Sequence, residues 1–139
     1  MSTKQLIIEQ VSPFNVPDTV EKLIQAAANK EWQNPAVHNL QQSLAKSGKE
    51  VRPVQVVEIC KPQYSGRMLE LSDERIVSVM MPCRISVYEK ADGRTYVALL
   101  DMAATAASLP LTVAEAIRGA NDESFEIVKS VTGAHIAGI

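Results

Sequence analysis

The sequence contains little cysteine and no excess of charge of one sign. Its two cysteines, Cys60 and Cys83, form no Cys-x-x-Cys pair, so the chain shows neither a disulfide framework nor a local zinc-ligand pattern. Lys and Arg number 14 against 16 Asp and Glu, which gives a formal net charge of −2. This small charge creates no field that would attract nucleic acid or an anionic membrane, and we expect neither as a partner.

Long hydrophobic runs are also missing. No stretch approaches the roughly 18 apolar residues of a membrane-spanning helix. The run of apolar residues before Ser12 is shorter than the roughly 7–15-residue apolar core of a secretory signal. We therefore expect a cytoplasmic protein whose two thiols are reduced.

The motifs of familiar nucleotide-binding and hydrolytic enzymes are absent. The six glycines are scattered, and they form no GxxxxGK[ST], GxGxxG or GxSxG pattern; HExxH is also missing. These absences argue against an NTPase, a dinucleotide-binding enzyme or a common hydrolase, and they leave any cofactor unknown.

What is present is sufficient for one folded domain spanning residues 1–139. Hydrophobic residues make up 46% of the chain, enough for a core that needs no disulfides. Strand patterns occupy residues 5–11, 52–60, 83–89 and 94–100, helical patterns occupy 17–30, 36–47 and 113–131, and a mixed signal covers 62–80. The order β-α-α-β-α-β-β-α predicts an α+β fold: a two-layer sandwich with a largely antiparallel sheet and helices on one face.

Local signals mark the predicted helix ends. Asn15 is expected to cap the first helix, and Gly48 is expected to end the second. Thr112 and Glu115 have the spacing of a capping box, which predicts that the last helix begins there. Gly133 is expected to end it.

Three soft ligands or nucleophiles form the candidate site. Cys60 ends a predicted strand and Cys83 begins the next clear one, so the thiols meet at one end of the sheet if these strands are neighbours. His38 is expected to open the second helix, and a Cys₂His set is known zinc chemistry. The sequence thus suggests a ligand or metal site of Cys60, Cys83 and His38. The alternative is that both cysteines are ordinary buried hydrophobes.

Arg84 is a further candidate ligand-binding residue. With a two-residue Asp92-Gly93 turn, Arg84 faces Asp101 across the hairpin as an ion pair. A three-residue loop, Ala91–Gly93, would spoil that pairing, and the sequence permits it.

Several blocks resemble the family catalogued as domain of unknown function 302. They are Val54-Gln55-Val56-Val57-Glu58-Ile59-Cys60-Lys61-Pro62, then Met80-Met81-Pro82-Cys83-Arg84-Ile85-Ser86-Val87-Tyr88-Glu89-Lys90, and Asp92-Gly93-Arg94-Thr95-Tyr96. The Met-Pro-Cys-Arg block looks like a cysteine-bearing branch of that family. The resemblance implies a compact two-layer domain, commonly a homodimer, and no established reaction or catalytic residue.

Three hypotheses about function remain open. The first is a dimeric protein that binds a small ligand or metal through the Cys/His cluster. The second is a thiol-based redox or sulfur-transfer enzyme that uses Cys60 and Cys83. The third is a structural or interaction module without a small ligand. The sequence leaves open whether the protein is an enzyme, and we favour the first hypothesis.

Overall fold

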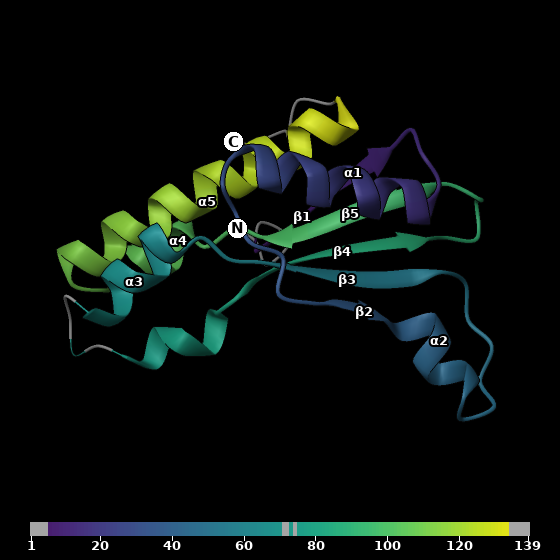
Figure 1. Ribbon diagram of the computed structural model, residues 1–139, viewed down its shortest axis with the longest axis horizontal. Helices are drawn as coiled ribbons and strands as arrows, with labels where there is room; N and C mark the ends of the chain where they lie inside the picture. The colour runs from purple at the N-terminus through teal and green to yellow at the C-terminus, as the bar shows by residue number, and fades with distance from the viewer. Residues whose placement is uncertain (1–5, 71–72, 74, 134–139) are drawn as a thin grey trace.

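The chain folds into a five-stranded antiparallel sheet with helices packed on it (Figure 1). The computed structural model describes residues 6–70, 73 and 75–133. The strands are β1 (Ile7–Ser12), β2 (Val37–Asn39), β3 (Val54–Ile59), β4 (Cys83–Glu89) and β5 (Thr95–Leu100), in the spatial order β1-β5-β4-β3-β2. This confirms the predicted α+β fold class; Gln5, the first residue of the first predicted strand, lies outside the described residues.

Two long helices cover one face of the sheet. They are α1 (Val16–Asn29) and α5 (Leu111–Thr132). A shorter helix, α3 (Pro62–Glu70), packs on α5 and leads into the 3-10 helix η2 (Arg75–Met80). The remaining helices are α2 (Leu40–Ala45) and α4 (Ala103–Ala106). In the described part of the chain, no helix has the length and apolar character needed to cross a bilayer.

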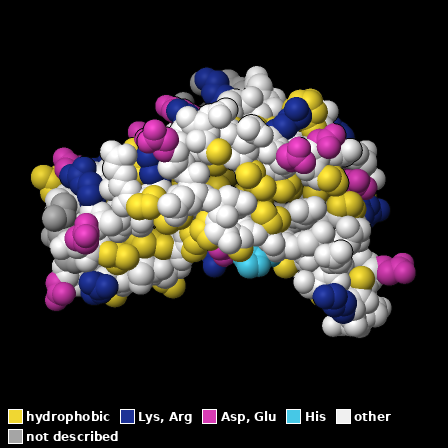
Figure 2. Space-filling view, in the orientation of Figure 1, with side chains coloured by type: hydrophobic (Ala, Val, Ile, Leu, Met, Phe, Trp, Pro, Cys, Tyr) yellow, Lys and Arg dark blue, Asp and Glu magenta, His cyan; other side chains and the backbone are white. Residues whose placement is uncertain are grey.

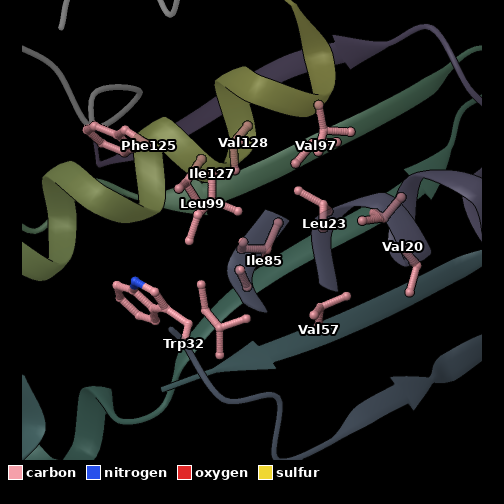
Figure 3. Packing of buried hydrophobic residues seen from close by; sticks show 14 of the residues in the cluster. Val20, Leu23, Trp32, Val57, Ile85, Val97, Leu99, Phe125, Ile127 and Val128 are labelled. Atoms are coloured by element: carbon pink, nitrogen blue, oxygen red, sulfur yellow. The ribbon is translucent and has the colours of Figure 1, made fainter. Parts of the chain in front are cut away.

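The core lies between the sheet and the two long helices (Figure 3). Strand residues alternate between faces, and every second side chain points into this layer. Val57, Ile85 and Val97 are fully buried, beneath Leu23 of α1 and Ile127 of α5. The hydrophobic periodicity of the sequence therefore identified the main core.

Helix ends follow the predicted signals in part. The Asn15 side chain accepts a hydrogen bond from the Asp18 amide at 2.9 Å and caps α1. Gly133 ends α5 with a left-handed φ of 69°, which suits a residue without a Cβ. The Thr112–Glu115 capping box does not form, because α5 already begins at Leu111 and Thr112 lies inside the helix.

The predicted helix over 36–47 is wrong in its first half. Residues Val37–Asn39 form β2, which pairs with β3 at the sheet edge, and only Leu40–Ala45 is helical. The Asn39 side chain accepts from the Gln42 amide at 3.0 Å and starts the helix after the strand. Backbone pairing with β3 outweighs the weak helical spacing of Val37, Leu40 and Leu44. Gly48, with a φ of 78°, follows the helix as expected.

The hairpin between β4 and β5 has the three-residue loop rather than the two-residue turn. Lys90 N donates to Arg94 O at 3.1 Å, so the loop is Ala91–Gly93. Gly93 adopts a φ of 78°, as such loops require. The resulting register pairs Ile85 with Leu99, which places Arg84 beside Leu100. The predicted Arg84–Asp101 ion pair is therefore wrong, and Asp101 instead accepts a hydrogen bond from Asn121 at 3.1 Å.

The contact between α3 and α5 depends on a glycine. A Cβ built on Gly119 would lie 2.5 Å from the Tyr64 ring, which is closer than packed atoms allow. Gly66, which lies in α3, has no such constraint, since its Cβ would lie 3.5 Å from the flexible end of Glu70.

We predict opposite effects for two glycine-to-alanine substitutions. Gly119→Ala should displace Tyr64 and lower the free energy of unfolding by about 1–3 kcal/mol, the usual cost of overpacking. Gly66→Ala should raise it by about 0.5–1 kcal/mol, because alanine favours a helix. Urea unfolding monitored by circular dichroism measures both. Equal effects of the two changes would contradict the proposed close approach.

Candidate functional site

The pairing of β3 with β4 brings the two cysteines together. Ile59 is the register partner of Cys83, and Cys60 follows Ile59 directly. The strands are joined through α3 and η2, so the end of β3 lies beside the start of β4. Both cysteines are free thiols and half-buried. The sequence placed the thiols together only on the condition that these strands are neighbours, and β3 and β4 are neighbours.

Both thiols line one small cavity, which we call the thiol cavity. Its volume is about 30 Å³, enough for one or two water-sized groups and far below the roughly 300–1,000 Å³ of an organic ligand site. Its lining is mostly apolar and includes two methionines, two aromatic residues and a lysine. The lining residues are Trp32, Ile59, Cys60, Lys61, Tyr64, Ser65, Met68, Met81, Pro82, Cys83 and Ala120.

A second cavity touches Cys83 but not Cys60. It also measures about 30 Å³, and its walls include Met80 and Met102. The sequence has five methionines, and all except Met1 thus line one of the two cavities that share Cys83. Sulfur is concentrated around this thiol.

Glu123 of α5 fixes the wall of the thiol cavity without lining it. Its carboxylate accepts hydrogen bonds from Trp32 Nε1 at 2.8 Å, from Lys61 Nζ at 3.0 Å and from the Tyr64 hydroxyl. All three donors line the cavity. One carboxylate therefore ties the end of α1 and the start of α3 to α5.

The backbone places Trp32 and Cys60 side by side. Glu31 adopts a left-handed φ of 65°, and the Trp32 amide donates back to the Ala27 carbonyl at 2.9 Å. The next residue, Gln33, then exchanges two backbone hydrogen bonds with Cys60, at 2.7 and 2.9 Å. The Cys60 Sγ lies 3.6 Å from Ser65 Oγ in the first turns of α3.

His38 lies elsewhere. It pairs in register with Val56 of β3, whose side chain points away from the helices, whereas Cys83 packs against the main core on the helical side. Its Nε2 is 2.9 Å from Glu58 Oε2. His38 does not line the thiol cavity, and its predicted place at the start of a helix is wrong because it belongs to β2.

Arg84 shares the face of the sheet that carries His38. Its Nε is 3.7 Å from Glu58 Oε2, so Glu58 bridges Arg84 and His38. Arg84 and Cys83 are neighbours in β4 and point to opposite faces. Arg84 lines the second cavity with Cys83, but none of Arg84, Glu58 and His38 lines the thiol cavity. Among the described residues, no group of three or more His, Cys, Asp or Glu side chains could hold a metal ion, so Cys60, Cys83 and His38 do not form a ligand set.

Comparison with known proteins identifies the family. The family model described as "Domain of unknown function DUF302" matches residues 8–126. The chain belongs to this family. A crystal structure of an uncharacterized conserved DUF302 protein from Bacillus stearothermophilus superimposes with a TM-score of 0.80 at 16% identity, over 91% of this chain and 98% of that one. At this identity the likeness shows the fold alone. No curated protein matches the chain.

Sequence reasoning missed the role of Glu123 in this DUF302 chain. Glu123 lies between Ala120 and Ile127, at a position where the apolar stripe of α5 continues, and a carboxylate at such a position needs a buried partner. The unusual position of Glu123 could be recognised from the sequence, but its hydrogen-bond partners could not. Trp32, Lys61 and Tyr64 lie 59 to 91 residues away in the chain.

The surroundings raise the pKa of the Cys83 thiol and lower the pKa of the Glu123 carboxylate. Burial, and to a lesser extent the nearby Cys60, raises the pKa of Cys83 from 9.0 to about 11. The hydrogen bond to Glu123 raises the pKa of Tyr64 to about 12. Burial alone would raise the pKa of Glu123, but hydrogen bonds from Tyr64, Trp32 and Lys61 outweigh it and lower the pKa. The Cys83 thiol and the Glu123 carboxylate therefore hold opposite protonation states at neutral pH.

We predict that Cys83 makes stability fall with alkaline pH. Between pH 9 and about 11 the unfolded chain has lost the Cys83 proton while the folded chain retains it. The free energy of unfolding should therefore decline across this window, by at most roughly 2–3 kcal/mol from this group. Cys83→Ala should flatten the decline, as measured by urea unfolding at several pH values. Tyr64 titrates in both proteins, so only the difference between them counts; identical slopes would contradict the assignment.

Proposed function

We propose that the protein binds a thiophilic metal ion through Cys60 and Cys83. The observation that supports this function is that two thiols 23 residues apart in the sequence line the same small, largely apolar cavity. A cavity of about 30 Å³ suits a single ion rather than an organic molecule. This proposal keeps the thiols of the sequence-based hypothesis and removes His38, which contacts Glu58 on the other face of the sheet.

The chemistry of such a site is simple. Thiolates, not thiols, bind metal ions, so binding replaces the protons of Cys60 and Cys83 and releases them to solvent. Because Cys83 keeps its proton to about pH 11 in the free protein, apparent affinity should rise with pH. The hydrogen bonds to Glu123 hold three wall residues in place, which limits the rearrangement that binding requires.

The first test is anaerobic titration of the reduced protein with Cu(I) and, separately, Cd(II). We expect one ion per chain, a near-ultraviolet thiolate-to-metal absorption band and a higher melting temperature. Saturation at about 100 times Kd stabilises the fold by about 2.7 kcal/mol. Cys60→Ser and Cys83→Ala should each abolish the band, whereas the control His38→Ala should bind like the wild type.

Two outcomes would refute the proposal. If neither ion binds the wild type, or if both cysteine variants bind as well as it does, the thiol cavity is not a metal site. Mild oxidation of the same variants tests the thiol-redox alternative. A reversible Cys60–Cys83 disulfide without metal binding would favour a redox pair.

We also propose that the protein is a homodimer that uses the sheet face opposite the helices, here called the open face. Ile7 and Leu100 are register partners on this face, and 54% and 45% of their surfaces are exposed. Four residues along β5, on the same face, Tyr96 stacks with Tyr88, and the ring centroids are 6.1 Å apart. Figure 2 shows the hollow outline of the molecule on the side of the sheet away from α1 and α5.

The charges of the open face are already paired within the chain. Glu58 contacts His38 and Arg84, and Glu9 contacts Lys90 and the Tyr88 hydroxyl. Burying this face against a second copy would leave no isolated charge, which is the usual obstacle to burying charged residues.

Light scattering on a sizing column tests the dimer. We expect the wild type to have twice the mass of one chain, and Ile7→Glu to convert it to a monomer, because the register partner Leu100 offers the new carboxylate no charge with which to pair. Leu111→Glu is the matched control, because Leu111 is 70% exposed at the start of α5, away from the open face. A monomeric wild type, or equal effects of the two changes, would refute the open face as the interface.

A further inference from the structure

The identity of the metal ion follows from the sulfur atoms around the thiols. This inference rests on the metal-binding function proposed above. Two thioether side chains, Met68 and Met81, line the thiol cavity together with Cys60 and Cys83. The lining offers no histidine and no carboxylate. The cavity is lined by four sulfur-bearing residues, and its harder side-chain groups are the Ser65 and Tyr64 hydroxyls and the Lys61 amine, which is held in an ion pair with Glu123.

We propose that the ion is Cu(I), held by the Cys60 and Cys83 thiolates with the thioethers of Met68 and Met81. Thiolate and thioether ligands together select Cu(I), whereas structural zinc sites use four thiolate or imidazole ligands. Two cysteines without a histidine supply only half of such a zinc set. Leucine can replace a methionine that only fills space, because the two side chains have similar volumes. Leucine cannot replace a methionine that binds a metal ion through its sulfur.

The burial of these residues suits an ion that must be kept from water. Met68 is 7% exposed, Cys83 packs against the main core, and the Trp32 and Tyr64 rings lie on the same cavity with their centroids 6.2 Å apart. A net charge of −1 results when two thiolates bind one Cu(I), and Lys61, whose side chain is positively charged, is one of the residues that line the cavity. Lys61 is itself 3.0 Å from Glu123, so it is fixed at this position by an ion pair.

The second cavity provides a matched control. Met80 and Met102 also lie near Cys83, but in a cavity that Cys60 does not reach. Of the four described methionines, Met68 and Met81 are therefore assigned as ligands, whereas Met80 and Met102 are not.

Methionine-to-leucine variants test this division. Leucine conserves most of the volume of methionine and removes only the sulfur. Cu(I) affinity is measured anaerobically by competition with a chromogenic Cu(I) chelator, and the melting temperature of each metal-free variant reports its packing. We expect Met68→Leu and Met81→Leu each to weaken Cu(I) binding by about tenfold or more, and Met80→Leu and Met102→Leu to leave it unchanged.

Different results would refute the thioether assignment, the choice of ion and the metal-binding function. Wild-type affinity in Met68→Leu and Met81→Leu would overturn the thioether assignment while leaving the thiol site intact. Equal losses in all four variants would show a packing effect and overturn it as well. Failure of the wild type to bind Cu(I) while it binds Cd(II) would refute the choice of ion, and failure to bind either ion would refute the proposed function itself.

Discussion

The antiparallel pairing of β3 with β4 is the constraint on which the rest of the site depends. It aligns Ile59 with Cys83 and thereby places Cys60 at the same end of the sheet. The connection between the strands, residues 61–82, must then fold back over that end, and it does so as α3 and η2. This segment also contains Met68 and Met81, so the sulfur atoms of the thiol cavity belong to one stretch of chain whose two ends are fixed by the sheet.

The two faces of the sheet divide the polar chemistry of the protein. On the helical side, burial raises the pKa of Cys83 and the surroundings of the thiols are mostly apolar. On the open face, Glu58 contacts Arg84 and His38, which are 60% and 48% exposed. Exposed ion pairs of this kind add little to stability, about 0–1 kcal/mol each. Their effect is to pair the charges of the open face within the chain.

The sequence predicted the sheet, the long helices and the neighbourhood of the thiols because these follow from local patterns. Alternation marks β4 and β5, the helical period marks α1 and α5, and the order of elements made β3 and β4 plausible neighbours. It failed where a short segment was decided by its partner: Val37–Asn39 has helical spacing but pairs with β3. It failed again at the hairpin, where one extra loop residue moved the register and separated Arg84 from Asp101. His38 was lost from the site for the first of these reasons, since its position in β2 directs it to the open face.

Glu123 explains how a mostly apolar cavity can include a lysine, a tyrosine and a tryptophan in its wall. A carboxylate near the core is stable only when its oxygens accept enough hydrogen bonds, and those from Trp32, Lys61 and Tyr64 are sufficient to lower its pKa despite burial. All three donors belong to residues that line the cavity, and each bonds to Glu123 through its polar atom. The close approach of Tyr64 to Gly119 makes this arrangement tight, because only a residue without a Cβ lets the ring reach the carboxylate from α3. The carboxylate thus orients three side chains of the cavity wall, and a wall built in this way is ordered before any ligand binds.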